Sequence, residues 1–536
     1  MFFLILLLLQ EASAQFVTHH LPLFEPALPK PQFLVPTIDP TFGSTITRIT
    51  NAKDSNRAGI FNNYSRRQAW NCDESMLMLH SGRKLRLYHG QSYQFIREIN
   101  TDNAIDLFWH PTNPNMLYFM LDTTMYTYDA LQNRMSVYYV FDNLKHFPRA
   151  GYYKYMNNGA GDISRDFRYY AFHSYVVRLS DGARIFSDVI LFDIPQKKVL
   201  KQIPVTTLID TLYGGVTISP LGNYIVVSFI NKESKRKAGL KIYDREFRYL
   251  WTFPSQVIHF DLGIEPSGEE VCVMEYGDTL DVTTRIKKVR LSDGMETELM
   301  QLSGLFNIHV SCRNLLRNDW CFVKCVDGYG VIRFDSASWM PFRDEVFAVK
   351  MDGSGAVHRL THHHGRAYDS SNGRYMTKSN YRSEVHATAS RRGDRILFAS
   401  NWGQNVLSDS ALDTYVVDFR NLLTTTERFV SHRSSVILHG NYPNPFSERT
   451  SIRFSLFDET VHTNPRRSIS QSKYVSLKIF NVLGAEVTTL MDGELPDGDH
   501  EVEFNSMVRG MRLRSGLYFY RLIGRGEWKV GVMVDE

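Results

Sequence analysis

The chain has 536 residues, with 61 Lys and Arg against 57 Asp and Glu, for a formal net charge of +4. This near-balance argues against a dedicated nucleic-acid-binding protein, in which basic residues are concentrated. A hydrophobic fraction of 43% and an aromatic fraction of 13% exclude a disordered chain and favour β structure. Five cysteines are too few for a disulfide-built scaffold.

The N-terminus has the pattern of a secretory signal peptide. Residues 2–9 read FFLILLLL, and Ala12-Ser13-Ala14 follows. This apolar run is too short to cross a bilayer, but it fits the hydrophobic region and A-x-A cleavage site of a signal peptide. We therefore expect a signal peptide over residues 1–14, then an N-terminal extension over 15–44. The alternative is an apolar terminus without a targeting role. No other segment approaches the roughly 20 apolar residues of a membrane helix, so we expect no membrane span.

A repeated unit, a polar turn followed by a short alternating strand, fills the middle of the chain. It occurs at residues 71–79, 110–119, 164–172, 219–228, 265–274, 312–323 and 390–400. A second unit of strand, turn and often another strand follows each copy, at residues 84–88, 125–130, 189–200, 240–250, 286–299, 345–360 and 414–422.

Two hairpins per repeat make a four-stranded antiparallel sheet, and repeats of this size arranged radially make a propeller. We therefore predict an all-β protein with a seven-bladed β-propeller over residues 45–425. A strand at Thr45–Thr50 would complete the last blade and close the ring. A pair of β-sandwiches is the alternative, but it does not predict this alternation of units.

The pattern changes after Leu423. A polar linker at 426–438 precedes short alternating strands over 439–536, separated by Gly, Pro and Asp turns. These features predict a small, immunoglobulin-like β-sandwich.

Residues 439–536 closely resemble the C-terminal sorting domain of the bacterial type IX secretion system. NYPNPF, the LKIFNVLGAEV strand pair, the LPDGDHEVEF hairpin and SGLYFYRL occur in that order. One departure is the long basic stretch at residues 459–473, which we expect to form a surface loop. The resemblance implies export through the periplasm by the type IX secretion machinery, and delivery to the cell surface or to the medium.

Channel-lining residues follow from where each inner strand ends. His309 and His386 lie shortly before such ends, as does Gln68, and they belong to blades that become neighbours when the ring closes. His259 lies near the same level of blade 5, and His364 belongs to the run 362–364, which we place on a loop between blades. Converging imidazoles can hold a transition metal or supply a general base. The alternative is that these histidines are packing residues.

A second resemblance covers roughly residues 45–425. SEVHATASRRGDRILFAS at 383–400, with NIHVSC at 307–312, looks like the oligogalacturonate lyases, seven-bladed propellers that cleave uronic-acid polymers around a manganese ion. The resemblance implies His309 and His386 as metal ligands and His259 as the base. Ser383 and Thr388 stand where the family has a glutamine and a second histidine. Glu384 flanks His386 and is a further channel-lining candidate.

The sequence thus predicts a secreted or cell-surface propeller that binds carbohydrate or another extracellular ligand. The alternative is a divergent, metal-assisted polysaccharide lyase, so whether the protein is an enzyme stays open. The basic run 232–237 is expected to be a solvated turn. Cys312 and Cys321 lie on neighbouring strands and are predicted to pair. The other three cysteines are expected to be small buried apolar residues.

Overall fold

The protein is almost entirely β in the part that the computed structural model describes. That part comprises residues 15–55, 59–82, 84–101, 105–141, 152–157, 163–178, 180–209, 212–230, 237–254, 257–278, 283–304, 306–327, 339–365, 385–403, 412–423, 436–456, 473–496, 498–508, 510–524 and 527–536. The predicted signal peptide at 1–14 and Glu384 lie outside it. Residues 231–236, 424–435 and 457–472 also lie outside, and they hold most of the basic run, the linker and the long basic stretch.

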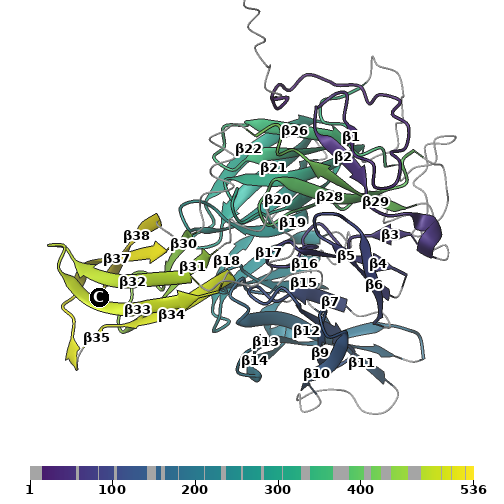
Figure 1. Cartoon of the computed structure of the whole chain (residues 1–536). Helices are drawn as coiled ribbons and strands as arrows, with labels where there is room; N and C mark the ends of the chain where they lie inside the picture. The colour runs from purple at the N-terminus through teal and green to yellow at the C-terminus, as the bar shows by residue number, and fades with distance from the viewer. Residues whose placement is uncertain are drawn as a thin grey trace, which may run out of the picture.

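Seven antiparallel sheets follow one another along the described chain, numbered here sheet 1 to sheet 7 (Figure 1). In sheets 1 to 6 the strand order in the sheet is the order in the chain. Sheet 1 contains β3 (Ile60–Phe61), β4 (Met76–Ser81), β5 (Lys84–His89) and β6 (Phe95–Asn100). Sheet 2 contains β7 (Ile105–Trp109), β8 (Met116–Leu121), β9 (Thr124–Asp129) and β10 (Arg134–Val140). Sheet 3 contains β11 (Tyr152–Asn157), β12 (Tyr169–Arg178), β13 (Arg184–Asp193) and β14 (Lys198–Pro204).

The remaining sheets repeat this plan. Sheet 4 contains β15 (Leu212–Ile218), β16 (Tyr224–Ile230), β17 (Lys237–Asp244) and β18 (Tyr249–Phe253). Sheet 5 contains β19 (Val257–Ile264), β20 (Glu270–Asp278), β21 (Thr283–Arg290) and β22 (Glu296–Ser303). Sheet 6 contains β23 (Phe306–Ser311), β24 (Trp320–Asp327), β25 (Glu345–Lys350) and β26 (Val357–His362). Sheet 7 contains β27 (Thr388–Ala389), β28 (Arg395–Ser400), β29 (Asp413–Asp418), β2 (Thr45–Arg48) and β1 (Thr37–Ile38).

Helices are nearly absent from the described residues. These contain the 3-10 turn η1 (Ala52–Ser55) and the four-residue helix α1 (Val205–Leu208). No helix in the described ranges has the length and apolar content that crossing a membrane requires.

Sheet 7 is built from both ends of the repeat region. β2 pairs antiparallel with β29, with Ile46 opposite Val417 and Arg48 opposite Tyr415. This confirms that the strand predicted near residues 45–50 joins the last sheet. Because β2 precedes sheet 1 in the chain and completes sheet 7, it ties the two ends of the sheet series together.

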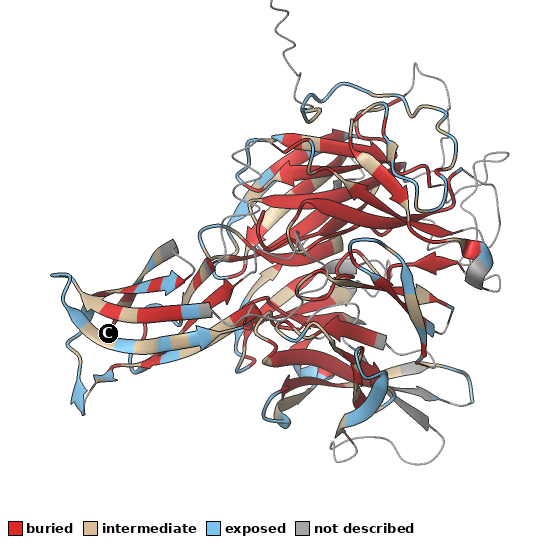
Figure 2. Cartoon of the chain, viewed as in Figure 1, coloured by how far each residue is buried: buried red, intermediate tan, exposed pale blue. Residues whose placement is uncertain are grey.

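The hydrophobic core is divided among the interfaces between successive sheets. Each interface has its own cluster of buried side chains, and Figure 2 shows the strands of this region as mostly buried. One more cluster joins sheet 7 to sheet 1, with Leu397 and Val416 packed among Ile60, Leu77 and Leu79. Face-to-face sheets whose last member packs on the first are consistent with a β-propeller.

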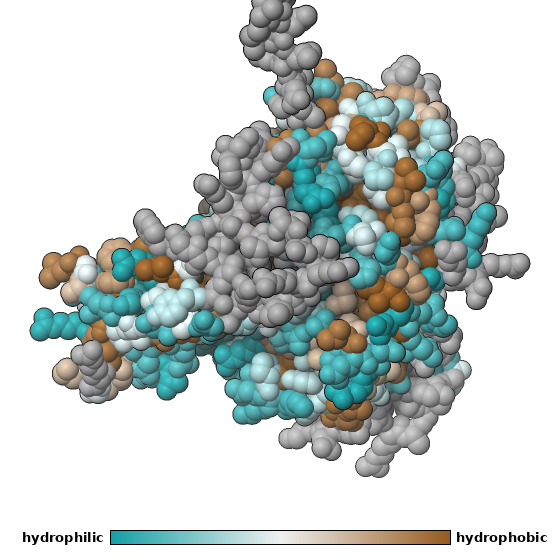
Figure 3. All heavy atoms as spheres, in the orientation of Figure 1, coloured by the Kyte–Doolittle hydropathy of each residue, from teal (hydrophilic) through white to brown (hydrophobic). Residues whose placement is uncertain are grey.

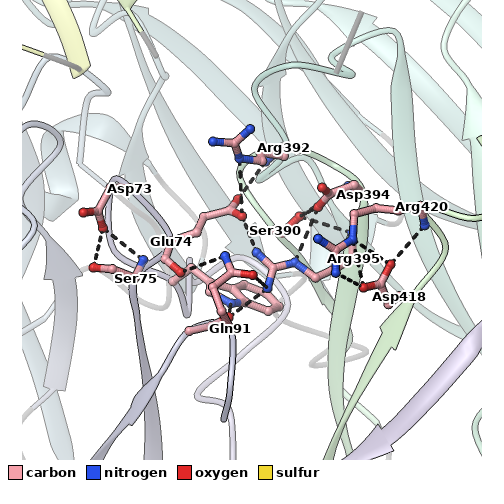
Figure 4. A network of polar contacts seen from close by, with 12 residues as sticks. Asp73, Glu74, Ser75, Gln91, Ser390, Arg392, Asp394, Arg395, Asp418 and Arg420 are labelled. Atoms are coloured by element: carbon pink, nitrogen blue, oxygen red, sulfur yellow. Dashed lines mark hydrogen bonds and ion pairs between the residues drawn. The ribbon is translucent and has the colours of Figure 1, made fainter. Parts of the chain in front are cut away.

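Figure 4 shows the polar network at the junction of sheets 7 and 1. The Arg395 guanidinium on β28 donates to the carboxylate of Glu74, in the turn before β4. Both side chains are almost fully buried, at 1% and 2% exposure. Arg395 also donates to the carbonyl oxygen of Gly90 at 2.8 Å and lies over the Trp70 ring at 5.2 Å. Such a buried pair is costly to disrupt, because either partner alone would be an unpaired charge away from water.

Residues 436–536, called here the C-terminal module, form two further sheets that share one hydrophobic core. One sheet contains β30 (Val436–Tyr442), β31 (Arg449–Leu456) and β34 (Gly498–Asn505). The other contains β33 (Glu486–Leu495), β32 (Lys473–Asn481), β37 (Gly516–Gly524) and β38 (Glu527–Asp535). β35 (Met507–Val508) and β36 (Met511–Arg512) pair with each other.

Two sequence-based expectations for the C-terminal module need correction. The predicted LPDGDHEVEF hairpin is wrong, because β33 and β34 belong to different sheets and the chain crosses between sheets there. In addition, β30 begins at Val436, three residues before the predicted boundary at 439. The LKIFNVLGAEV strand pair is confirmed, since β32 and β33 pair antiparallel.

The N-terminal extension lies along β26. Val17 forms a bridge with Arg359, whose guanidinium also donates to the carbonyl oxygens of His19 and Leu21. Arg359 pairs with Glu345, and both side chains are fully buried. The extension is therefore bound to the edge of sheet 6.

The structure corrects two expectations about cysteine. All five cysteines are free thiols, so the predicted disulfide between Cys312 and Cys321 is not formed. The two sulfurs do face each other, 3.6 Å apart. Cys272 and Cys325 are buried as expected, whereas Cys72 is half-buried.

We predict that Glu74→Gln destabilises the protein by about 3 kcal/mol, because it leaves Arg395 buried without its anionic partner. Thermal and urea unfolding of the two proteins would measure the change. The control is Glu503→Gln, which removes an exposed pair with Arg449 and should cost less than about 1 kcal/mol. Equal unfolding midpoints for Glu74→Gln and the unmodified chain would show that the junction does not depend on this ion pair.

Candidate functional site

Three predicted histidines from consecutive sheets lie in contact. His309 on β23 stacks against His259 on β19, with ring centroids 4.0 Å apart, and its ring centroid is 4.5 Å from that of His386, just before β27. His309 and His386 are buried, and His259 is partly exposed. The structure thus brings together the imidazoles that the sequence placed on neighbouring inner strands.

Tyr64 joins this group from sheet 1. Its ring centroid lies 5.4 Å from that of His309 and 4.8 Å from that of His386. The guanidinium of Arg66 lies over the Tyr64 ring at 5.4 Å and over the Phe260 ring at 4.6 Å. Sequence reasoning missed Tyr64, although it stands in the same segment as Gln68 and only four residues before it.

His259 has a carboxylate partner. Its Nδ1 lies 2.8 Å from Oε2 of Glu275 on β20, the strand beside β19. Glu275 is almost fully buried. A carboxylate that accepts from Nδ1–H fixes the ring orientation and leaves Nε2 as an acceptor, the arrangement of a general base. Glu275 was not predicted, because nothing in the sequence shows which residue of the next strand faces His259.

The histidine group does not by itself form a complete set of metal ligands among the described residues. These residues contain no group of three or more His, Cys, Asp and Glu side chains that could hold a metal ion. Thr388, at the position of the family's second histidine, donates its hydroxyl to the carbonyl oxygen of Arg67 at 3.0 Å. The manganese ion therefore stays an untested prediction, and we derive no chemical step from it.

His364 lies in a different environment from the one predicted. We expect the run 362–364 on a loop between blades, and His363 and His364 do lie after β26, on the connection from sheet 6 to sheet 7. His362, however, is the last residue of β26, and all three histidines are buried. His364 Nδ1 lies 3.0 Å from Oε1 of Glu25, and its ring packs on Trp402 with centroids 4.3 Å apart. His364 therefore helps to hold the N-terminal extension in place.

A small cavity of about 70 Å³ lies where the first strands of the sheets end, and we call it the central cavity. All seven sheets contribute to its lining, as does Asp499 of β34. Gln68 lines it as predicted and donates to the carbonyl oxygens of Arg313 and Ala389, both at 3.2 Å. Its polar and apolar lining is Arg66, Gln68, Leu107, Phe108, Trp109, Pro111, Ile163, Ser164, Arg165, Thr217, Ile218, Pro220, Asp261, Leu262, Arg313, Leu315, Arg391 and Asp499.

Four arginines of the central cavity escaped the sequence analysis. Arg165 and Arg391 each follow the serine that begins a repeat unit, and Arg313 follows Cys312 at the same position; Arg66 follows Ser65, five residues before the first unit begins at Asn71. This recurring Ser-Arg or Cys-Arg pair was a signal that could have been read. Arg66 connects the cavity to the histidine group, since it lines the cavity and also packs on Tyr64.

The C-terminal module covers this end of the sheet ring. Arg453 on β31 donates to Oδ1 of Asn223 at 3.0 Å, and it pairs with Glu501 on β34 at 3.3 Å. Arg168 of sheet 3 approaches the same Glu501 carboxylate at 3.9 Å. Asp499, two residues before Glu501, lines the central cavity itself. The module therefore contributes to the wall of the cavity.

Comparisons with known proteins give the following. No family model and no curated protein matches the chain. One solved structure that is similar is an oligogalacturonate lyase from Vibrio parahaemolyticus, with 12% sequence identity and a TM-score of 0.49, covering 72% of this chain and 96% of that one. A likeness of this extent shows neither the activity nor the ligand of the present chain.

We predict that docking of the C-terminal module weakens as the pH rises from about 5 to 7. Burial raises the pKa of Asp166 to about 7, and its hydrogen bond with Glu501 acts in the same direction. At Glu501 burial acts to raise the pKa, but the charge of Arg453 and the hydrogen bond with Asp166 outweigh it and lower the pKa to about 2. In the docked state Asp166 keeps its proton up to a pH of about 7, whereas an undocked Asp166 releases it at lower pH. The free energy that favours docking therefore decreases as the pH rises, and levels off above about 7.

Hydrogen exchange of the β34 amides, corrected for intrinsic rates, would measure this effect. Exchange should rise between pH 5 and 7 in the unmodified chain and stay level in Asp166→Asn. Asp181→Asn, an exposed carboxylate of sheet 3, serves as the control. If Asp166→Asn kept the full pH dependence, another group would be responsible.

Proposed function

We propose that this protein is an exported, seven-bladed β-propeller that binds an extracellular ligand, of carbohydrate class, in its central cavity. The observation that carries the proposal is the cavity, to which every sheet of the series contributes. In a propeller, ligands enter where the inner strands of all blades meet, because only there do side chains from different blades converge.

The division of the core supports seven blades. A closed ring of seven sheets has seven interfaces. Each interface here has its own apolar cluster, and the last cluster joins sheet 7 to sheet 1. The two sheets of the C-terminal module and their single core support the proposed immunoglobulin-like β-sandwich.

The lining of the cavity suits a sugar. Phe108 and Trp109 offer apolar rings, and the arginines offer donors for hydroxyl and acidic groups. Ligand sites combine such apolar walls with a few placed polar groups. The proposed ligand is therefore a carbohydrate that places one polar or acidic group in the cavity, since about 70 Å³ does not admit a whole sugar chain.

A metal-assisted polysaccharide lyase remains the second candidate. One observation favours it, the contact of His259 with Glu275, which orients an imidazole as a base would be oriented. In that case His259 is the proposed base, while His309 and His386 are the proposed metal ligands.

We also propose that residues 439–536 act as a type IX sorting domain. The supporting observation is the exposed apolar surface of the module, which offers contacts to a partner. Figure 3 shows hydrophobic atoms scattered among hydrophilic ones over the visible face, in the module as well as on the sheets. Exposed members within the module include Val482, Leu483 and Met511. The predicted signal peptide at 1–14 would supply the earlier step, passage into the periplasm.

We predict that the full-length protein is retained on a glycan array and that Arg66→Met lowers its affinity about tenfold or more. Methionine keeps the packing on Tyr64 and Phe260 but removes a charged donor worth about 1.5–3 kcal/mol. The control is Arg449→Met, an exposed arginine of the C-terminal module.

Two results would decide the matter. No retention on any glycan would count against carbohydrate binding. Release of unsaturated products from a bound polyuronate, lost in His259→Ala, would replace the binding proposal with the lyase.

The export proposal has its own test. Removing residues 436–536, so that the chain ends before β30, should leave the protein in the periplasm, because the sorting contacts are then missing. Fractionation of cells with antibody detection would measure this. A replacement of Leu483 by Lys tests the exposed apolar surface without removing the module. Normal surface delivery of the truncated chain would contradict the proposal.

A further inference from the structure

The central cavity has an excess of positive charge. Four arginines line it, Arg66, Arg165, Arg313 and Arg391, against the two carboxylates of Asp261 and Asp499. Repeated arginines facing one enclosed space repel one another, and each also loses hydration there. A bound anion in the cavity would reduce this repulsion and so lower the free-energy cost of burying the arginines.

Only part of this charge is neutralised by the cavity's own wall. Arg313 forms a two-pronged pair with Asp261, with nitrogen–oxygen distances of 2.8 and 3.1 Å. Arg66 packs on the rings of Tyr64 and Phe260, and its charge also acts on Asp261. Arg165 donates from Nη2 to the carbonyl oxygen of Cys312 at 3.4 Å, but within the described residues its buried Nη1, and the buried Nε and Nη2 of Arg391, donate to no acceptor.

A carboxylate of the C-terminal module lines the same cavity as Arg165 and Arg391. Asp499 lines the cavity from β34, and its carboxylate accepts a hydrogen bond from the hydroxyl of Ser455. Burial lowers the pKa of Arg165 to about 10, while the charge of Asp499 acts in the opposite direction. The electrostatic balance of the cavity thus depends on a residue outside the seven sheets.

We propose that the central cavity is a binding site for an oxyanion group, held by Arg165 and Arg391, and that Asp499 of the C-terminal module weakens this binding by its own negative charge. The inference rests on the proposed role of the cavity as the ligand site. Beyond the proposed function, it specifies that the ligand carries negative charge and that the docked module lowers the affinity of the cavity for it. Guanidinium groups suit this task because their donors match the oxygens of carboxylate and sulfate.

The test is isothermal titration calorimetry of the full chain with sodium sulfate, at constant ionic strength maintained with sodium chloride. Asp499→Asn keeps the shape of the side chain and its acceptor for Ser455 but removes the charge. We expect it to bind sulfate about tenfold more tightly than the unmodified chain. We expect Arg391→Gln and Arg165→Gln each to bind about tenfold more weakly. A gain of affinity in Asp499→Asn cannot result from misfolding.

The matched controls are Arg449→Gln and Asp492→Asn in the C-terminal module, which should leave sulfate affinity unchanged. A second titration with glucuronate and with neutral glucose separates the sources of the oxyanion. Tighter binding of glucuronate than of sulfate indicates the carboxylate of a sugar, and the reverse order indicates an inorganic ion.

Equal sulfate affinity in the unmodified chain, Asp499→Asn and Arg391→Gln would overturn the inference, as would the absence of binding in all three. Neither result would contradict the proposed function, because retention of a neutral glycan on the array would still support carbohydrate binding. Conversely, sulfate binding that follows the expected order without retention of any glycan would refute the carbohydrate ligand and leave the oxyanion site in place.

Discussion

Closure of sheet 7 onto sheet 1 is the constraint on which the rest of the structure depends. Each sheet buries its faces only against its neighbours, so an open series would leave two apolar faces in water. The chain meets this requirement in two ways. β2 supplies the strand that completes sheet 7 beside β29, and the buried pair of Arg395 with Glu74 joins β28 to the turn before β4. The apolar cluster around Leu397 and Leu77 fills the space between them.

The same closure creates the central cavity. When the sheets meet in a ring, the ends of their first strands face one another, and residues far apart in sequence line one space. Arg165, Arg313 and Arg391 occupy equivalent places in three repeats, and Arg66 joins them from the segment before the first unit, so charge is concentrated at the centre. The C-terminal module then covers this end, held by Arg453 and Glu501, and adds Asp499 to the wall. The composition of the cavity wall and docking of the module are thereby linked.

Much of this could be read from the sequence, and the missing parts share one cause. The repeat units predicted the sheets and β2, and the position of His309 and His386 near strand ends placed them in contact. Tyr64 and Glu275 were missed because they contact the histidines from other segments of the chain. Such contacts do not occur at a fixed spacing in the sequence. The burial of the run 362–364 was missed for a similar reason. His363 and His364 follow β26 on the connection to sheet 7 as expected, but nothing in the run indicates that the N-terminal extension, with Glu25 as the partner of His364, buries them.

The sequence by itself determined the alternation of turns and strands, because side chains of a strand alternate between two faces and turns need polar residues and glycine. It also determined the strand that completes sheet 7 and the inner-strand position of the histidines. Only the tertiary structure decided which side chains meet. The pairing of His259 with Glu275, the burial of His364, the crossover between β33 and β34 and the entry of Asp499 into the cavity all depend on contacts between distant segments. Such contacts are selected by the packing of whole sheets, for which no local pattern carries the information.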